Sequence, residues 1–488
     1  MRQSFIFRQH FLLTNKGPSL PEFLKNKGIK VISNPSITYF IKVYGCQMNT
    51  NDSEIFNSIM HSNNYQQLND IKDAKYVFLM TCAIREKAES KIWHEIAALK
   101  RMKKSIGILG CMAENLKEKL LDKVDLIAGP DTYKDIPLLI NALECNPSIT
   151  GIGNVQLSTE ETYADIIPIR TDKTSKSAYV SITRGCNNMC SFCIVPFTRG
   201  IERSRPFQVI LDEVARLRDE GIKEITFLGQ NVNSYNDKDY EPTHLHSMTE
   251  GFSTLYTVKT GARFTQLLDK ASDIAPQVRF KFTSPHPKDF PMDLLKVIHS
   301  KKNICKSIHL PMQSGSTAIL NKMRRGYSKE AYLNLALTIR KLMPYAVIST
   351  DIITGFCDET DKDFEDTLDI VKQVKFEIAY MFAYSMRPKT HAFHNFKDNV
   401  PQATKIQRLK ELIRVFHSNS KQSLSRFIGK ELQVLVEKKG KIENQMRGKT
   451  DIGISAYFTT NTPVPIGSLV KVKVISNTSA SFETKLIK

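Results

Sequence analysis

Apolar, β-rich runs alternate with helical runs along most of this chain of 488 residues, and that alternation limits the folds open to it. Three early strand candidates are "ITYFIKVYGC", "AKYVFLMTC" and "SIGILGC". Helical stretches follow them, such as "NDSEIFNSIMHSN", whose apolar residues fall on one face. Strands that alternate with helices form parallel sheets, so residues 36–150 are predicted to fold as an N-terminal parallel α/β sheet domain.

The three early strand candidates all end in a cysteine, at Cys46, Cys82 and Cys111. Open parallel sheets bind ligands along the edge formed by the carboxyl ends of their strands. Thiols that are far apart in the sequence are therefore expected to meet at this edge.

A second α/β region is predicted over residues 176–420. Its strand candidates are Ala178–Thr183, Glu224–Gly229, Val278–Thr283, Lys306–Leu310, Val347–Ile352 and Ala379–Tyr384. Six β/α units predict a partial barrel rather than a closed barrel of eight strands. Residues 236–262 are polar with little periodicity, which is typical of an inserted loop.

The two ends of the chain differ from its middle. Residues 1–35 are predicted to be a flexible segment that resembles a mitochondrial transit peptide, with Arg2, Arg8 and Lys16 but no acid before residue 22; a disordered tail of chance composition is the alternative. Residues 151–175 are predicted to be a linker. Residues 421–488 alternate like strands and predict a small antiparallel β-barrel. From Arg426 onward the chain has eleven Lys and Arg against five Asp and Glu, which favours contact with nucleic acid over a purely structural cap.

Composition supports a basic protein with reduced thiols. The chain has 69 Lys and Arg against 50 Asp and Glu, a net charge of +19, which favours a polyanionic partner. No apolar run approaches the length of a membrane-spanning helix. Nine cysteines, an odd number, in a chain without a secretory signal argue against a disulfide scaffold and for metal ligands. Cys145, Cys305 and Cys357 have no partner spacing and are predicted to be inert thiols.

Three of the cysteines lie close together in "RGCNNMCSFC", with the spacing C-x₃-C-x₂-C formed by Cys186, Cys190 and Cys193. Zinc sites use paired cysteines with a fourth ligand, which is missing here. Three thiolates on an iron–sulfur cubane leave one iron open to a small chelating molecule. The run therefore favours a cluster over a zinc knuckle or a chance grouping.

The C-x₃-C-x₂-C run resembles the signature of the radical S-adenosylmethionine (SAM) superfamily. The stretches "YGCQMNTNDSE", "TCAIREKAE", "GILGCMAE", "LGQNVNSY", "FTSPHP", "HLPMQSGS" and "MRRGY" resemble the motifs of the methylthiotransferase family, from about residue 37 to the end. "GCQMN" is similar to the MiaB-like branch, which modifies isopentenylated adenosine in tRNA. "TCAIREKAESKIW" and "FTSPHPKDFP" look closest to its eukaryotic mitochondrial form, which is named for association with a regulatory subunit of cyclin-dependent kinase 5.

The resemblance implies a fold, cofactors and partners. The middle region would be a radical SAM partial barrel and the C-terminal barrel an RNA-binding TRAM module. Cys186, Cys190 and Cys193 would hold one 4Fe–4S cluster, and Cys46, Cys82 and Cys111 a second. One SAM would be cleaved to give a radical, since no side-chain base can remove a hydrogen from C2 of adenine. A second SAM would supply the methyl group of 2-methylthio-N6-isopentenyladenosine.

The same resemblance implies tRNA as substrate and a ferredoxin-like or flavodoxin-like electron donor. The family and the N-terminal segment together predict a mitochondrial location, with the cytoplasm as the alternative. No membrane partner is expected.

Family position also assigns weaker roles. Phe192, Gln230, Asn231 and Asp351 would contact SAM, although buried Gln or Asp side chains are often only hydrogen-bond partners at strand ends. Arg199, Arg203 and Arg205 would orient substrate or meet tRNA phosphates, or else form a solvated basic face.

Three further features are ambiguous. His309 is predicted to be a packed histidine. The aromatic pair Tyr457–Phe458 beside "MRGKT" would suit either RNA binding or a barrel core. Cys357–Asp358 replaces the Pro–Gly of many relatives, so the turn there must be made differently, and Asp358 would place a negative charge near the SAM ribose.

The sequence is also compatible with two alternative functions. One is a methylthiotransferase that acts on threonylcarbamoyl-adenosine in tRNA or on a ribosomal protein. The other is a binding protein without enzymatic activity that takes part in kinase regulation. All six matching cysteines are intact, and a pure adaptor has no physical need for two open-iron sites.

Overall fold

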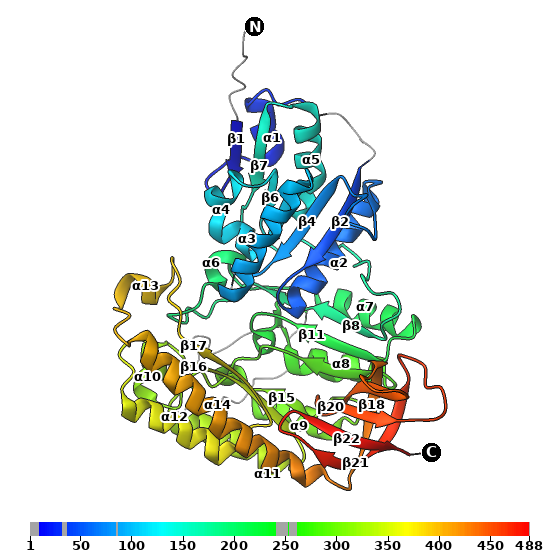
Figure 1. The fold of residues 1–488 in the computed structure, drawn as a ribbon, viewed down its shortest axis with the longest axis vertical. Coiled ribbons are helices and arrows are strands. Elements are labelled where there is room, and N and C mark those ends of the chain that lie inside the picture. Colours follow the sequence, from blue (N-terminus) through cyan, green and yellow to red (C-terminus); the bar gives the residue numbers. More distant parts are fainter. Residues whose placement is uncertain (1–8, 32–36, 84–85, 241–251, 253–260, 488) are drawn as a thin grey trace. The chain divides into compact units, whose positions relative to one another are not determined.

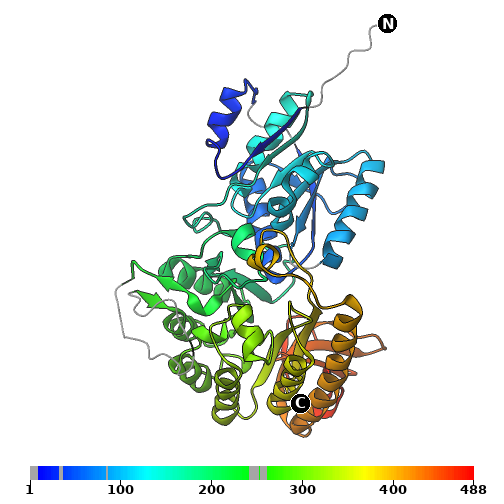
Figure 2. The same ribbon diagram turned by 90° about the vertical axis from the view of Figure 1, so that its left-hand side faces the viewer.

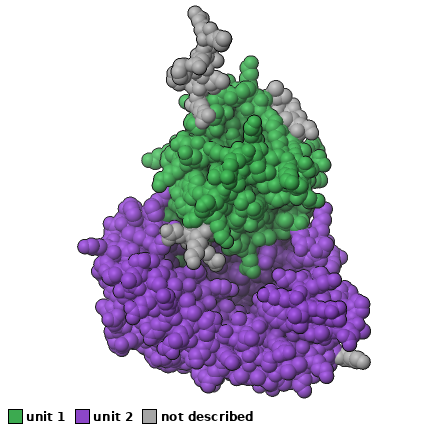
Figure 3. Space-filling model, in the orientation of Figure 1, with its two compact units in different colours: residues 1–171, 184–188, 194–203 green, residues 172–183, 189–193, 204–488 purple. Residues whose placement is uncertain are grey.

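The computed structural model of the chain describes residues 9–31, 37–83, 86–240, 252 and 261–487. It divides into two compact units (Figure 3). The first unit comprises residues 1–171, 184–188 and 194–203, and the second comprises residues 172–183, 189–193 and 204–488. Within the described ranges, no helix has both the length and the apolar character needed to span a bilayer.

A parallel sheet of seven strands forms the centre of the first unit, as predicted (Figure 1). Its order is β1-β7-β6-β5-β4-β2-β3, and every neighbouring pair is parallel. The strands are β1 (Gln9–Leu13), β2 (Thr38–Val43), β3 (Gln66–Gln67), β4 (Tyr76–Thr81), β5 (Ser105–Gly110), β6 (Leu126–Ala128) and β7 (Ile149–Asn154).

Helices cover both faces of this sheet (Figures 1 and 2). They are α1 (Leu20–Asn26), α2 (Gln47–Ser62), α3 (Glu86–Arg101), α4 (Cys111–Leu121) and α5 (Ile136–Cys145), with the short α6 (Val195–Arg199). Strand β4 shows why: Val77 and Leu79 belong to one apolar core, whereas Phe78 and Met80 belong to another. A strand whose successive side chains all enter a core must lie at the centre of a sheet with two covered faces.

Two predicted boundaries differ from the structure. Residues 9–26 belong to the segment 1–35 that is predicted to be flexible, but β1 pairs with β7 and α1 buries Leu20 and Leu24 in the core of the first unit. The apolar residues that resemble a transit peptide also suit a sheet edge, which is why composition misplaced them. The predicted linker begins inside β7, and Tyr163 is buried in the same core, so this unit extends to residue 171.

Six parallel strands form the partial barrel of the second unit. Two groups of three, β8-β11-β14 and β15-β16-β17, are parallel throughout, and a parallel bridge from Phe280 to Ile304 continues the first group toward β15. All six predicted strands are present, as β8 (Ser177–Ser181), β11 (Glu224–Leu228), β14 (Arg279–Phe282), β15 (Ser307–His309), β16 (Val347–Thr354) and β17 (Ile378–Ala383). The short strands β9 (Thr183–Arg184) and β10 (Arg203–Ser204) lie on either side of the cysteine run.

Helices connect these strands. They are α7 (Phe207–Asp219), α8 (Phe264–Ile274), α9 (Met292–Ser300), α10 (Thr317–Lys322), α11 (Lys329–Leu342), α12 (Asp361–Val374), α13 (His391–Asn395) and α14 (Gln402–Leu424). Thr360 caps α12 through a capping box with Asp363. The predicted insertion is closed at its base by the antiparallel pair β12 (Asn236–Asp237) and β13 (Ala262–Arg263). Residues 241–251 and 253–260 of the insertion lie outside the described residues.

The chain ends in a closed five-stranded barrel, also part of the second unit. Its strands are β18 (Glu431–Lys439), β19 (Gln445–Thr450), β20 (Ser455–Thr459), β21 (Leu469–Asn477) and β22 (Ser481–Leu486). Four pairings are antiparallel, and the parallel pair β20-β22 closes the barrel. Phe458 belongs to its core, whereas the Arg447 guanidinium lies 5.5 Å from the centre of the Tyr457 ring.

Candidate functional site

Three thiols meet at one edge of the N-terminal sheet. Cys46 is the third residue after β2 and directly precedes α2, Cys82 directly follows β4, and Cys111 is the first residue of α4 after β5. Because β2, β4 and β5 are neighbours in a parallel sheet, their carboxyl ends lie together. The sheet order thus gathers residues that are 36 and 29 positions apart in the chain.

Glycines allow two of these cysteines to approach their neighbours. Gly45 has a φ of +116°, and a Cβ added to it would lie 2.7 Å from the Cβ of Cys82. Gly110 has a φ of +90°, and an added Cβ would lie 2.7 Å from the carbonyl oxygen of Thr81. Both distances are below ordinary contact, so a side chain at either position would push the strand ends apart.

A buried arginine joins this N-terminal thiol trio. The Nε of Arg199 donates to the Sγ of Cys111 at 3.2 Å, and its Nη2 donates to Asn49 Oδ1 at 3.3 Å. Contact with the Cys82 thiol and the positive charge of Arg199 lower the pKa of Cys46 to about 6. Burial raises the pKa of Cys111, and Arg199 opposes that effect. The surroundings therefore favour the thiolate form of Cys46, the form that binds metals.

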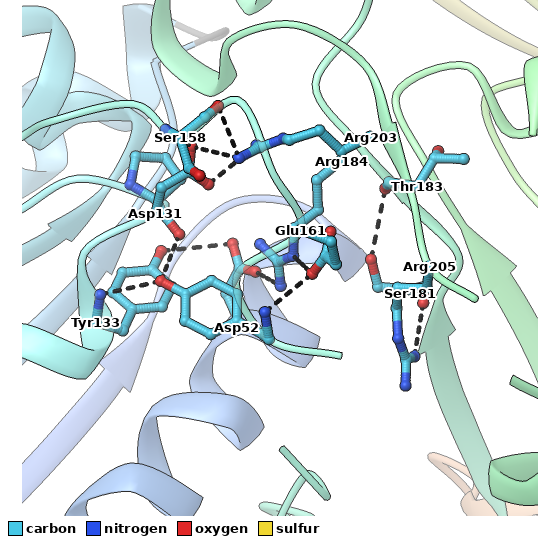
Figure 4. A network of polar contacts seen from close by, with 12 residues as sticks. Asp52, Asp131, Tyr133, Ser158, Glu161, Ser181, Thr183, Arg184, Arg203 and Arg205 are labelled. Atoms are coloured by element: carbon cyan, nitrogen blue, oxygen red, sulfur yellow. Dashed lines mark hydrogen bonds and ion pairs between the residues drawn. The ribbon is translucent and has the colours of Figure 1, made fainter. Parts of the chain in front are cut away.

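Arg199 also belongs to a buried charge network in the first unit (Figure 4 draws its neighbours Asp52, Arg184 and Arg203). Asp52, which is fully buried, accepts a hydrogen bond from Arg199 Nη2 at 2.8 Å and forms an ion pair with Arg184 Nη2 at 2.8 Å. Arg184 lies 3.7 Å from Glu161 and stacks on the Tyr163 ring with a centroid distance of 4.7 Å. The two arginines lower the pKa of Asp52 against the opposing effect of burial.

The N-terminal thiol trio has the ligand type of an iron–sulfur cluster. In the described part of the chain, no three His, Cys, Asp or Glu side chains converge to hold one metal ion. A cubane needs a wider arrangement, because each thiolate ligates a different iron. Cys111 accepts a hydrogen bond from Arg199, and hydrogen bonds to the cysteine sulfurs are a usual part of iron–sulfur sites.

The local cysteine run is held by backbone contacts. In the first unit, Cys186 N–H donates to Gly200 O at 3.1 Å, and Asn188 N–H donates to Cys186 Sγ at 3.4 Å. In the second unit, Cys193 N–H donates to Cys190 O at 3.0 Å, which closes a turn. Ser191 anchors that turn through Met323 O and Lys322 O, at 3.0 and 2.7 Å.

A second buried arginine contacts this run. The Nη1 of Arg325 donates to Cys190 Sγ at 3.2 Å, and its Nε donates to Tyr327 Oη at 3.0 Å. Sequence reasoning assigned no role to Arg325 or to Asp52. Both lie inside motifs of the sequence, "MRRGY" and "GCQMNTND". The motifs thus mark the two residues, but they do not indicate which side chains these residues contact.

The residues predicted to contact SAM lie in four different settings. Gln230 is the second residue after β11. Its Oε1 is buried and has no hydrogen-bond partner among the described residues, so a bound donor would satisfy it. Asn231 instead donates to Asp289 at 2.8 Å and accepts from His286 N–H at 3.1 Å.

The other two predicted SAM contacts are also engaged. Asp351, in β16, pairs with His309 Nε2 at 3.2 Å. Phe192 packs against the apolar cluster that contains Met323 and Phe356. Of the four residues, only Gln230 thus presents a buried group that a bound molecule would satisfy; the SAM roles of all four stay predictions.

The three arginines predicted to bind substrate are all buried. Arg199 pairs with Asp52, as described above. Arg203 forms a bidentate pair with Asp131, at 2.9 and 3.0 Å, and Arg205 pairs with Glu213 at 2.8 Å. Each charge is thus already met by a carboxylate, so their placement lends no support to a phosphate-binding role, which stays a prediction.

Two of the remaining cysteines are buried, and the turn at Asp358 is made without a glycine. Cys305 and Cys357 are buried, and burial raises the pKa of Cys305 to about 11, consistent with an inert thiol. Asp358 takes the left-handed conformation with a φ of 62° that the missing glycine would otherwise supply. Its carboxylate pairs with Lys322 at 2.6 Å, so its charge has a partner within the protein.

Two family models match the chain. Residues 38–129 match the Uncharacterized protein family UPF0004, and residues 180–371 match the Radical SAM superfamily. Among solved structures, the radical SAM methyltransferase TsrM from Kitasatospora setae, with cobalamin and a 4Fe–4S cluster bound, superposes with a TM-score of 0.52. It is 11% identical and covers 74% of this chain and 77% of its own. Fold and motif together define a radical SAM protein.

Full-length relatives narrow the class. A mouse protein named mitochondrial tRNA methylthiotransferase CDK5RAP1 is 45% identical over 91% of this chain and 79% of its own length. A tRNA-2-methylthio-N(6)-dimethylallyladenosine synthase from Chloroherpeton thalassium is 42% identical over 92% of this chain and 96% of its own length. The chain therefore belongs to the radical SAM methylthiotransferase family, in its MiaB-like tRNA branch.

Proposed function

We propose that this chain converts N6-isopentenyladenosine, next to the anticodon of tRNA, to its 2-methylthio derivative. The names of the full-length relatives, a tRNA methylthiotransferase and a tRNA-2-methylthio-N(6)-dimethylallyladenosine synthase, support this substrate. The observation that carries the proposal is the convergence of Cys46, Cys82 and Cys111 at one sheet edge, in addition to the C-x₃-C-x₂-C run. A radical SAM protein that only generates a radical needs one trio, whereas sulfur insertion calls for a second sulfur-binding site.

The thiols divide the chemistry between two sites. Cys186, Cys190 and Cys193 would hold the cluster at which SAM is cleaved, and Cys46, Cys82 and Cys111 would hold a second 4Fe–4S cluster. When bound, these groups supply a radical that removes hydrogen from C2 of adenine and a sulfur that replaces it, and a second SAM supplies the methyl group. The chain's own residues hold and orient these groups: Arg199 and Arg325 each donate a hydrogen bond to one thiol.

Other parts of the chain would bind the substrates. The buried Oε1 of Gln230 offers an acceptor for the SAM ammonium group. The C-terminal barrel has Arg447 beside the ring of Tyr457, a pairing of charge and aromatic surface that suits RNA. An electron donor of the ferredoxin or flavodoxin class would reduce the first cluster. The naming of the mouse relative supports a mitochondrial location.

Nucleoside mass spectrometry of tRNA tests this function. Cells that lack the gene should lose 2-methylthio-N6-isopentenyladenosine and accumulate N6-isopentenyladenosine. Re-expression of the chain should restore the modification, whereas the Cys190→Ala variant should not. Restoration of a methylthio group on threonylcarbamoyl-adenosine instead would assign the chain to the rival tRNA substrate.

A further inference from the structure

Arg325 is a buried cation whose hydrogen bonds go to neutral oxygens and one thiol. Arg325 is only 5% exposed. Nε donates to Tyr327 Oη at 3.0 Å, Nη2 donates to Pro311 O at 3.2 Å, and Nη1 donates to Cys190 Sγ at 3.2 Å. Guanidinium groups stay charged in proteins. A carboxylate is therefore the partner expected for it, yet none of the described carboxylates forms an ion pair with Arg325.

The neighbours of Arg325 do not supply the missing negative charge. Tyr327 is buried, and burial raises its pKa, which keeps its hydroxyl neutral. His286 is buried, and burial together with the charge of Arg325 lowers its pKa, so the imidazole is neutral as well. Lys288, close to His286, is paired with Asp289 at 3.8 Å, so this pair adds no net negative charge. Among these groups, Cys190 is the one that binds metals as a thiolate, which carries a negative charge.

A buried charge without a counterion is unfavourable, so its retention needs a reason. A structural reason would be the hydrogen bond to Pro311 O, but a neutral donor would serve a carbonyl equally well. The contact with Cys190 gives a reason that requires charge. A cubane held by three thiolates carries one net negative charge when oxidised and two after it gains one electron.

We propose that Arg325 is the positioning residue that supplies the counter-charge for the group bound by Cys186, Cys190 and Cys193, and so raises its reduction potential. This proposal rests on the cluster assigned to those cysteines under the proposed function. The added electron increases the negative charge beside the guanidinium, so Arg325 stabilises the reduced state more than the oxidised state. A neutral residue in its place shifts the equilibrium toward the oxidised state.

The test separates charge from hydrogen bonding. The full-length Cys46→Ala/Cys82→Ala/Cys111→Ala protein is reconstituted with iron and sulfide without oxygen, so that only the Cys186–Cys193 run carries a cluster. In this background, Arg325→Lys keeps the charge and Arg325→Gln keeps a donor without charge. Arg408→Gln serves as the matched control, because Arg408 is a buried arginine of the same unit that pairs with Glu359 and Asp361. Reduction by dithionite is followed by electron paramagnetic resonance against potential.

The Gln variant should have a reduction equilibrium constant at least tenfold lower than the Lys variant, which is 59 mV for a one-electron couple. The Lys variant and the Arg408 control should stay within threefold of the parent. Retention of iron by Lys but not by Gln would also support the proposal. Equal potentials in Lys and Gln, or loss of the cluster from the Lys variant, would overturn it. Absence of iron from the parent itself would instead contradict the proposed function.

Discussion

Two buried arginines each donate a hydrogen bond to a cysteine, one in each unit, but their charges are balanced differently. Arg199 lies 3.2 Å from Cys111 Sγ and 2.8 Å from the carboxylate of Asp52. Arg325 lies 3.2 Å from Cys190 Sγ, and its other hydrogen bonds reach the Tyr327 hydroxyl and the Pro311 carbonyl. The charge of the first guanidinium is thus met by a carboxylate. The second has no ion pair with a described carboxylate and lies beside the Cys190 thiol and 5.5 Å from the centre of the Tyr327 ring.

Two similar hydrogen bonds to sulfur can therefore affect the reduction potential of a bound cluster differently. Hydrogen bonds to sulfur and net charge both set the reduction potential of an iron–sulfur site. At the N-terminal trio the protein contributes a donor but little net charge, because Asp52 and Glu161 offset Arg184 and Arg199. At Cys190 the protein contributes both. The two sites should therefore respond differently when their ligands and arginines are changed.

The largest effect should come from the ligands of the local run. The Cys190→Ala variant should form no methylthio product and should cleave no SAM, because the proposed function assigns the radical-generating cluster to this run. Reconstituted wild-type protein should hold about eight irons, two cubanes' worth, and the variant about half of them. Iron analysis and assays of 5′-deoxyadenosine check both statements; full iron content in the variant would contradict the ligand assignment.

The Cys82→Ala variant should separate the two halves of the reaction. It should also lose about half the iron and all methylthio product, yet continue to cleave SAM to 5′-deoxyadenosine. Cys305→Ala is a suitable control, because Cys305 is a buried cysteine outside both trios. The prediction fails if Cys82→Ala abolishes SAM cleavage while Cys305→Ala preserves it.

A single substitution at Asp52 would disrupt the charge network of the first unit. Asp52→Asn should lower the free energy of unfolding by about 3–5 kcal/mol, because it leaves two buried guanidinium groups short of a counter-charge. Asp165→Asn, in an exposed pair with Lys134, should change it by less than about 1 kcal/mol. Chemical denaturation of the protein without clusters measures both; similar values for the two variants would refute the distinction between them.

The smallest effect is expected when Arg199, the arginine paired with Asp52, is replaced. Arg199→Gln should change the potential of the N-terminal cluster by less than about 59 mV, a tenfold change in the equilibrium constant, because Asp52 already offsets the charge of Arg199. The measurement uses a Cys186→Ala/Cys190→Ala/Cys193→Ala background, with Arg203→Gln as the control that touches no cysteine. A shift as large as the one expected at Arg325 would show that pairing with Asp52 does not attenuate the effect.

Sequence alone predicted much of this fold because its signals are local. Strand and helix periodicity located all six barrel strands and the cysteines that follow β2, β4 and β5. It did not reveal β1, because a short apolar strand at a sheet edge resembles targeting composition. The partners of buried charges were also hidden: Arg199, Arg203 and Arg205 form a basic run in the sequence, and only the fold brings a carboxylate to each.

One consequence of the shared carboxylate concerns the loading of metal. Arg184 precedes the run of Cys186, Cys190 and Cys193 and Arg199 follows it, and both reach the same Asp52. A single side chain therefore ties together both ends of the segment that carries these ligands. Because the entropy of bringing those ends together is already lost when the first unit folds, assembly of the inorganic centre does not have to supply it. The polypeptide thus prepares the receiving loop before any iron arrives.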